Sequence, residues 1–136
     1  FAEDVFGNQF SMDSGGRVGL FGAVTEEIAQ GVEGWARAIL DDFEYLSGHP
    51  LAHEYQKTFG VLPWGYRLIG KTPFILGGEY RLDNLVAVRD IDGMHARAEI
   101  ANATRGRAEG DSLPELPPGY RRVVSLGLAA AGKPNR

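Results

Sequence analysis

The sequence contains no cysteine among its 136 residues. Without cysteine the chain can form no disulfide bond, and it has no thiolate to serve as a nucleophile or a zinc ligand. This composition is compatible with the cytosol, where disulfide bonds are rare, and we expect a cytoplasmic protein. The chain also lacks any run of about 18 consecutive apolar residues, the length that a membrane-spanning helix requires. We therefore predict no contact with a membrane.

The chain also has no excess of basic residues. It contains 14 lysines and arginines and 18 aspartates and glutamates, so its net charge is −4. Proteins that bind nucleic acid through its phosphates need clustered Lys and Arg side chains, so we predict no direct nucleic-acid contact. No signal peptide is visible, and the first residue is Phe1 rather than Met. We expect from this that the chain lacks its natural N-terminal part.

Hydrophobic residues make up 43% of the chain and charged residues 24%, which is typical of a soluble globular domain. A chain of this length fits one domain. The pattern predicts a single α+β domain in which a mixed, mainly antiparallel sheet packs against helices. Alternating apolar residues over 6–12, followed by turn residues 13–16 and by Val18 and Leu20, predict a β-hairpin.

Helices are expected in the middle of the chain. A stripe of apolar residues at spacings of three and four predicts a main helix over 31–47: Val32, Trp35, Ile39, Phe43 and Leu46. Pro50 suits the first turn of a second helix, which Gly60 would end. Residues 85–88 form a compact strand candidate, and 94–103 have helical spacing. The segment 105–136 is an extension rich in proline and glycine, in which Val123, Val124, Leu126 and Leu128 predict an edge strand.

Two histidines, His49 and His53, are four residues apart and would share one face of a helix, with Glu54 directly after them. A zinc protease motif has its glutamate between the histidines, and here it follows them. This pair keeps open an alternative function, that of a metal-dependent enzyme or accessory subunit. A helix-capping His49 and a surface His53 explain the same spacing, and we predict no bound metal or other cofactor.

A stretch from Gly65 to Thr72 reads G-Y-R-L-I-G-K-T and formally matches the phosphate-binding loop of nucleotide hydrolases. That loop should open a long helix, whereas Pro73 follows here and residues 66–69 resemble a strand. We interpret the match as chance. No serine lies in a G-x-S-x-G elbow, so we predict no catalytic residue and no enzymatic activity.

Four stretches together resemble one family. They read F-A-E-D-V-F-G-N-Q-F over 1–10, V-E-G-W-A-R-A-I-L over 32–40, G-H-P-L-A-H-E-Y over 48–55 and K-T-P-F-I-L-G-G-E-Y over 71–80. In this order they resemble the actinobacterial, cell-wall-assembly-regulator-like branch of the SUKH superfamily. They are more faintly similar to the C-terminal domain of type VI secretion immunity proteins. The resemblance covers residues 1–104 as the domain, and the extension 105–136 departs from it.

The resemblance implies an α+β binding module whose family includes many immunity proteins. The expected function is therefore a bacterial, non-catalytic protein that binds and blocks a toxin, and the alternative is a scaffold domain of a longer protein. Partner-facing residues should lie on exposed loops or carry acidic charge. Our candidates for contact with the partner are Trp64, Tyr66, Asp41, Asp42 and Glu44.

Overall fold

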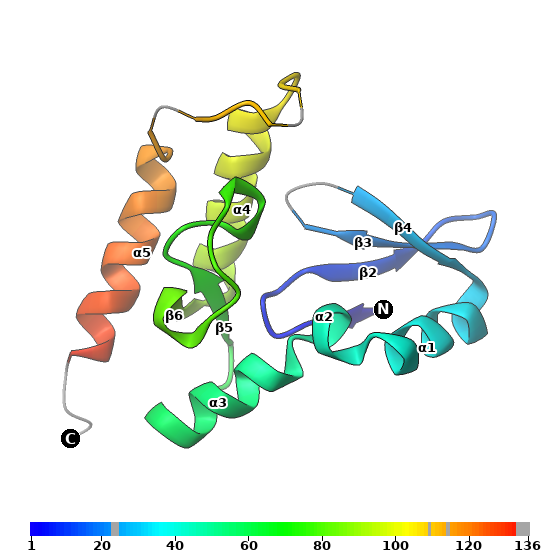
Figure 1. The fold of residues 1–136 in the computed structure, drawn as a ribbon, viewed down its shortest axis with the longest axis horizontal. Coiled ribbons are helices and arrows are strands. Elements are labelled where there is room, and N and C mark those ends of the chain that lie inside the picture. Colours follow the sequence, from blue (N-terminus) through cyan, green and yellow to red (C-terminus); the bar gives the residue numbers. More distant parts are fainter. Residues whose placement is uncertain (23–24, 109, 114, 133–136) are drawn as a thin grey trace. The chain divides into compact units, whose positions relative to one another are not determined.

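The computed structural model describes residues 1–22, 25–108, 110–113 and 115–132 (Figure 1). The α+β class is confirmed, because helices accompany two sheets in which every described strand pair is antiparallel. Contacts within the chain divide it into two compact units, Phe1–Val61 and Leu62–Arg136. Each unit has its own sheet and its own helices, and we describe them one at a time.

The first unit contains a four-stranded sheet in the order β1 (Ala2–Glu3), β2 (Gln9–Met12), β3 (Arg17–Phe21) and β4 (Thr25–Gln30). The predicted hairpin is confirmed as β2 and β3, which pair Phe10 with Leu20. Its turn is held by the carboxylate of Asp13, which accepts hydrogen bonds from the backbone N–H groups of Gly15 (2.9 Å) and Arg17 (3.0 Å). The two outer strands, β1 and β4, were not expected from the sequence.

Three helices follow this sheet: α1 (Gly31–Asp41), α2 (Phe43–Ser47) and α3 (His49–Phe59). Helix α1 packs against β3 and β4, and the ring of Trp35 meets that of Phe10 edge-on with 5.6 Å between centroids. The prediction of one helix over 31–47 is wrong. Asp42 leaves the helical conformation (φ −138°, ψ 57°), and its side chain accepts a hydrogen bond from the N–H of Tyr45, which starts α2.

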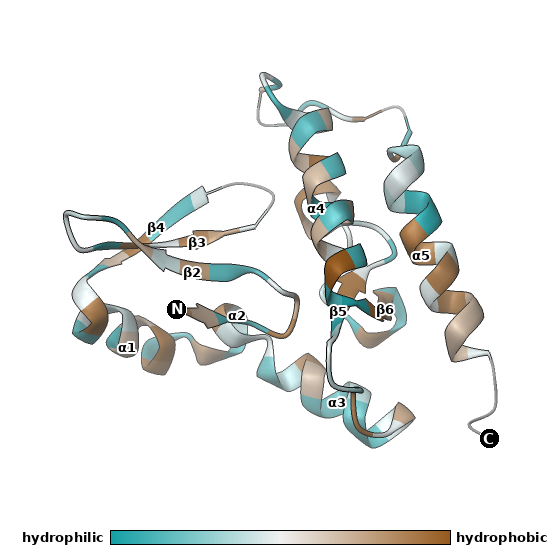
Figure 2. Cartoon of the chain, turned by 180° about the vertical axis from the view of Figure 1, so that it is seen from behind, coloured by the Kyte–Doolittle hydropathy of each residue, from teal (hydrophilic) through white to brown (hydrophobic). Residues whose placement is uncertain are grey.

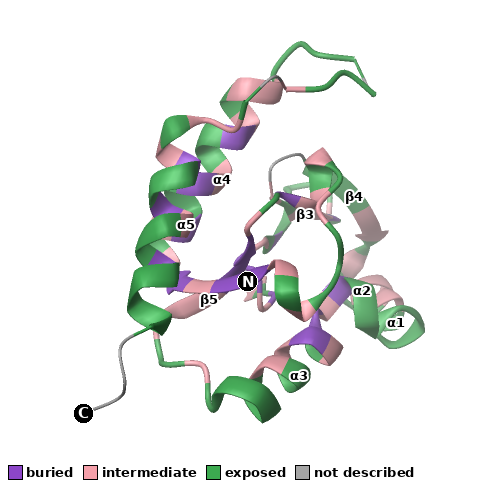
Figure 3. Cartoon of the chain, turned by 60° about the vertical axis from the view of Figure 1, so that its left-hand side comes forward, coloured by how far each residue is buried: buried purple, intermediate pink, exposed green. Residues whose placement is uncertain are grey.

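The second unit is built on the antiparallel pair β5 (Tyr66–Gly70) and β6 (Leu85–Arg89). Two short 3₁₀ turns, η1 (Phe74–Leu76) and η2 (Leu82–Asn84), lie between these strands. The predicted strand at 85–88 is confirmed. The predicted helix is also confirmed, as α4 (Asp90–Thr104), and Figure 3 shows buried residues on α4, on α5 (Pro118–Ala131) and on β5.

The edge strand predicted over Val123, Val124, Leu126 and Leu128 is wrong, because these residues belong to helix α5. Pro118 begins the helix, and its buried residues Tyr120, Val123 and Gly127 recur at helical spacings of three and four. The phenol of Tyr120 donates a hydrogen bond of 2.6 Å to the carbonyl of Gly70 at the end of β5. Burial raises the pKa of this phenol well above its ordinary value. Helix α5 of the extension is therefore packed into the second unit.

No helix among the described residues has both the length and the apolar composition needed to cross a membrane.

Candidate functional site

Trp64 lies in the loop between α3 and β5 and is fully exposed, at 100% of its possible surface. The backbone on both sides of it is fixed. The N–H of Tyr66 donates to the carbonyl of Pro63 (3.1 Å), and the carbonyl of Gly65 accepts from the N–H of Asp90 at the start of α4 (2.8 Å). The turn therefore holds the indole in solvent on a backbone whose conformation is already set.

Tyr66, the second aromatic candidate, is the first residue of β5 and is half-buried. Its register partner in the sheet is Arg89, whose guanidinium binds the carboxylate of Asp92 at 2.7 Å. This hydrogen bond and the charge of Asp92 raise the pKa of Arg89. Tyr66 thus lies in the sheet close to the Trp64 turn and presents only part of its ring to solvent.

The acidic candidates lie in the first unit, where α1 ends and α2 begins. Six consecutive residues there are all exposed, and we call them the α1–α2 surface: Leu40, Asp41, Asp42, Phe43, Glu44 and Tyr45. Apolar side chains interleave with carboxylates along this segment, and Leu40 is 80% exposed. Figure 2 shows hydrophobic and hydrophilic residues alternating along α1, which contributes Leu40 and Asp41 to this surface. The structure thus brings Asp41, Asp42 and Glu44 together on one short stretch, as their spacing suggested.

The apolar members of the α1–α2 surface were not expected from the sequence, whose spacing placed Phe43 on the apolar stripe of a single long helix. The helix instead breaks at Asp42, and Phe43, directly after the break, is exposed whereas Leu46 is buried. An Asp directly before Phe43 and three residues before Tyr45 is a plausible N-cap in its own right. That signal could have revealed the break and, with it, the exposed Leu40 and Tyr45.

The histidine pair lies on one face of α3, as predicted. The imidazole rings of His49 and His53 are nearly parallel, with 6.0 Å between centroids and 18° between planes. Both side chains are exposed, and the ring of Phe43 lies 5.5 Å from that of His49. No group of three or more His, Asp or Glu side chains suited to hold a metal occurs among the described residues. The pair alone offers no third ligand for an enzymatic metal centre.

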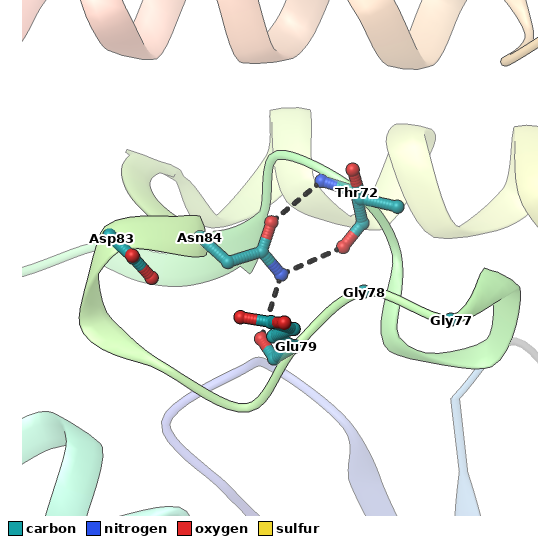
Figure 4. Close-up of a pocket in the computed structure, with 6 residues that line it drawn as sticks. All are labelled: Thr72, Gly77, Gly78, Glu79, Asp83 and Asn84. Atoms are coloured by element: carbon teal, nitrogen blue, oxygen red, sulfur yellow. Dashed lines mark hydrogen bonds between the residues drawn. The ribbon is translucent and has the colours of Figure 1, made fainter.

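The loop between β5 and β6 encloses a hollow of about 320 Å³ that is open to solvent. Asn84 organises it: its amide oxygen accepts from the N–H of Thr72 (2.9 Å), and its amide nitrogen donates to the carbonyls of Thr72 (3.0 Å) and Glu79 (2.9 Å) (Figure 4). These three hydrogen bonds occupy the side-chain amide of Asn84 and hold the loop in its conformation. The carboxylates of Glu79 and Asp83 both lie within 4 Å of the Arg81 guanidinium, whose single positive charge offsets half of theirs.

The stretch that formally matches a phosphate-binding loop has a different local structure. Most of it forms strand β5, and the amine of Lys71 donates to the carbonyl of Asp83 at 2.6 Å. The short turn η1 follows it instead of a long helix. The local geometry therefore agrees with the interpretation of a chance match.

Comparison of the chain with protein-family models, with curated proteins and with solved structures gives no match. What the chain does must therefore be inferred from its own residues.

Proposed function

We propose that this chain is a non-catalytic protein-binding module, and that its partner is a toxin which it binds and blocks in the cytoplasm. The observation that carries the binding role is the fully exposed Trp64 on a hydrogen-bonded turn. The choice of a toxin as partner comes from the resemblance of residues 1–104 to the SUKH superfamily. The lack of cysteine supports the cytoplasmic location.

Trp64 would contribute favourable free energy when a partner covers its indole. A tryptophan buries about 150–250 Å² when it is covered, which at about 25 cal/mol per Å² corresponds to about 4–6 kcal/mol before the costs of association. Tryptophan is also among the residues most often found as energetic hot spots in interfaces. Because the turn is already fixed by hydrogen bonds, little backbone entropy remains to be lost when a partner covers the indole.

The α1–α2 surface supports the same function from the first unit. Its exposed Leu40, Phe43 and Tyr45 supply apolar area, and its carboxylates would favour a partner surface that carries Lys or Arg. Asp42 contributes less than its charge suggests, since its side chain caps α2. We expect Asp41 to supply most of the electrostatic attraction to the partner.

The test is capture of the partner by the full chain in the source organism, followed by expression of that partner. A toxin should arrest growth when it is expressed alone, and co-expression of this chain should restore growth through a complex of one-to-one stoichiometry. A captured protein that is harmless on its own would contradict the toxin and leave a general binding or scaffold role. Failure to form any stoichiometric complex would contradict the binding function itself.

A further inference from the structure

The pair of imidazole rings on α3 is not used by the proposed function. His49 is the first residue of the helix and His53 lies one turn later, so their Cβ atoms face the same way. Both rings are exposed, and they lie nearly parallel with 6.0 Å between centroids. A metal ion could therefore approach both of them directly from solvent.

We propose that His49 and His53 together chelate one divalent ion of the borderline class, such as Zn²⁺ or Ni²⁺. Neutral imidazole nitrogen suits these ions, which bind it at about 2.0–2.1 Å. Two nitrogens on one ion must therefore lie within about 4.2 Å of each other. Reaching this separation requires both rings to rotate about their side-chain torsions, and exposed side chains change rotamer readily.

Joining two ligands on one helix strengthens metal binding by more than the helix dipole weakens it. Linking two binding groups strengthens binding by about 10²–10⁴-fold when the geometry permits both to engage. The positive end of the α3 dipole lies close to His49 and repels a cation, which weakens binding by about two- to five-fold. Chelation therefore dominates, and the site binds metal in spite of its position at a helix N-terminus.

The two histidines fill only part of a metal coordination sphere, and this sets the chemistry of the site. Zinc is usually four-coordinate, whereas the described residues offer no cluster of three or more His, Asp or Glu ligands. Water fills the remaining positions in the free protein. This open site differs from the expectation from sequence that the chain binds no metal, and it requires no catalytic activity.

The experiment is calorimetric titration of Ni²⁺ and of Zn²⁺ into the untagged full chain. We expect one ion per chain, with affinity at least about 100-fold lower in His49→Gln and in His53→Gln. The matched control is His95→Gln, since His95 is also exposed but lies on α4 in the other unit. It should leave the affinity unchanged.

Thermal unfolding separates the proposal from a purely structural role of the ring pair. We expect added metal to raise the melting temperature of the wild type and of His95→Gln, and not that of His53→Gln. Without metal, His53→Gln should melt like the wild type. The proposal would be overturned if all four proteins bound metal with equal affinity. It would also be overturned if His53→Gln lowered the metal-free melting temperature without changing metal binding.

Discussion

Gly48 separates α2 from α3 at a place where no other residue fits. Its φ is 68°, and a Cβ atom built there would lie 2.5 Å from the Cγ1 of Val5 and 2.6 Å from the ring of Phe6. We predict that Gly48→Ala lowers the free energy of unfolding by about 2–5 kcal/mol, the sum of the left-handed backbone conformation and the steric overlap. Urea denaturation measures this change.

Gly77 provides the matched control for Gly48. It too has a left-handed backbone (φ 86°, ψ 13°), but a Cβ there would meet nothing within 4 Å. Gly77→Ala should therefore cost only the backbone term, about 1–2 kcal/mol. Equal losses in the two variants would contradict the close packing of Gly48 against Val5 and Phe6.

The charge of Asp13 makes the stability of the β2–β3 hairpin depend on pH. The hydrogen bond from the Arg17 backbone N–H, together with the Arg17 guanidinium, lowers the pKa of Asp13 below its ordinary value of 3.8. Because the folded pKa is the lower one, the carboxylate stabilises the hairpin above pH 3.8, and this contribution disappears as the pH falls through the folded pKa. An NMR titration of the Asp13 carboxyl should show the lowered pKa in the wild type, and Arg17→Gln should raise it toward 3.8. If the pKa did not change in that variant, the Arg17 guanidinium would not be a cause of the shift.

At the scale of elements, α5 depends on close contact with β6. A Cβ atom at Gly127 would lie 2.6 Å from the Cγ2 of Val86 and 2.8 Å from the carbonyl oxygen of Ala87. Overpacking of this kind costs about 1–3 kcal/mol, whereas alanine in place of glycine favours a helix by about 1 kcal/mol. We predict a net loss of up to about 2 kcal/mol in the free energy of unfolding of Gly127→Ala, measured in urea.

Ser125→Ala is the control on the exposed side of the same helix. It should change the stability by less than about 0.5 kcal/mol. If Gly127→Ala were instead more stable than the wild type, helix propensity alone would set its free energy of unfolding. That result would contradict the close packing of α5 on β6.

The elements also show what the sequence could and could not reveal. Strong local signals predicted the β2–β3 hairpin, strand β6 and helix α4, because turn residues and apolar periodicity act over a few residues. Val123 and Val124 suggested a strand since β-branched residues favour one, yet the burial of Tyr120, Val123 and Gly127 makes the segment a helix. That choice depends on packing against β6, which is distant in sequence. For the candidate site, exposure of Trp64 was expected from its loop, whereas exposure of Phe43 followed from a helix break that periodicity obscured.

At the scale of the whole molecule, two surfaces are offered to a partner: the Trp64 turn in the second unit and the α1–α2 surface in the first. They should act on different steps of binding. Exposed charges mainly change the association rate and its salt dependence, whereas buried hot-spot residues mainly change the dissociation rate. We predict that Asp41→Asn slows association at low salt with little effect on dissociation, as measured by surface plasmon resonance with the purified partner. A change confined to the dissociation rate would contradict the electrostatic role of Asp41.

The proposed binding function depends above all on contact between the exposed Trp64 and a protein partner. The most direct test is the affinity of Trp64→Ala for the purified partner, beside Leu126→Ala, which removes an exposed apolar side chain on α5. We predict a loss of at least about 2 kcal/mol, roughly 30-fold in affinity, for Trp64→Ala, with unchanged urea stability and near-normal binding by Leu126→Ala. Wild-type affinity in Trp64→Ala would contradict a binding role of Trp64.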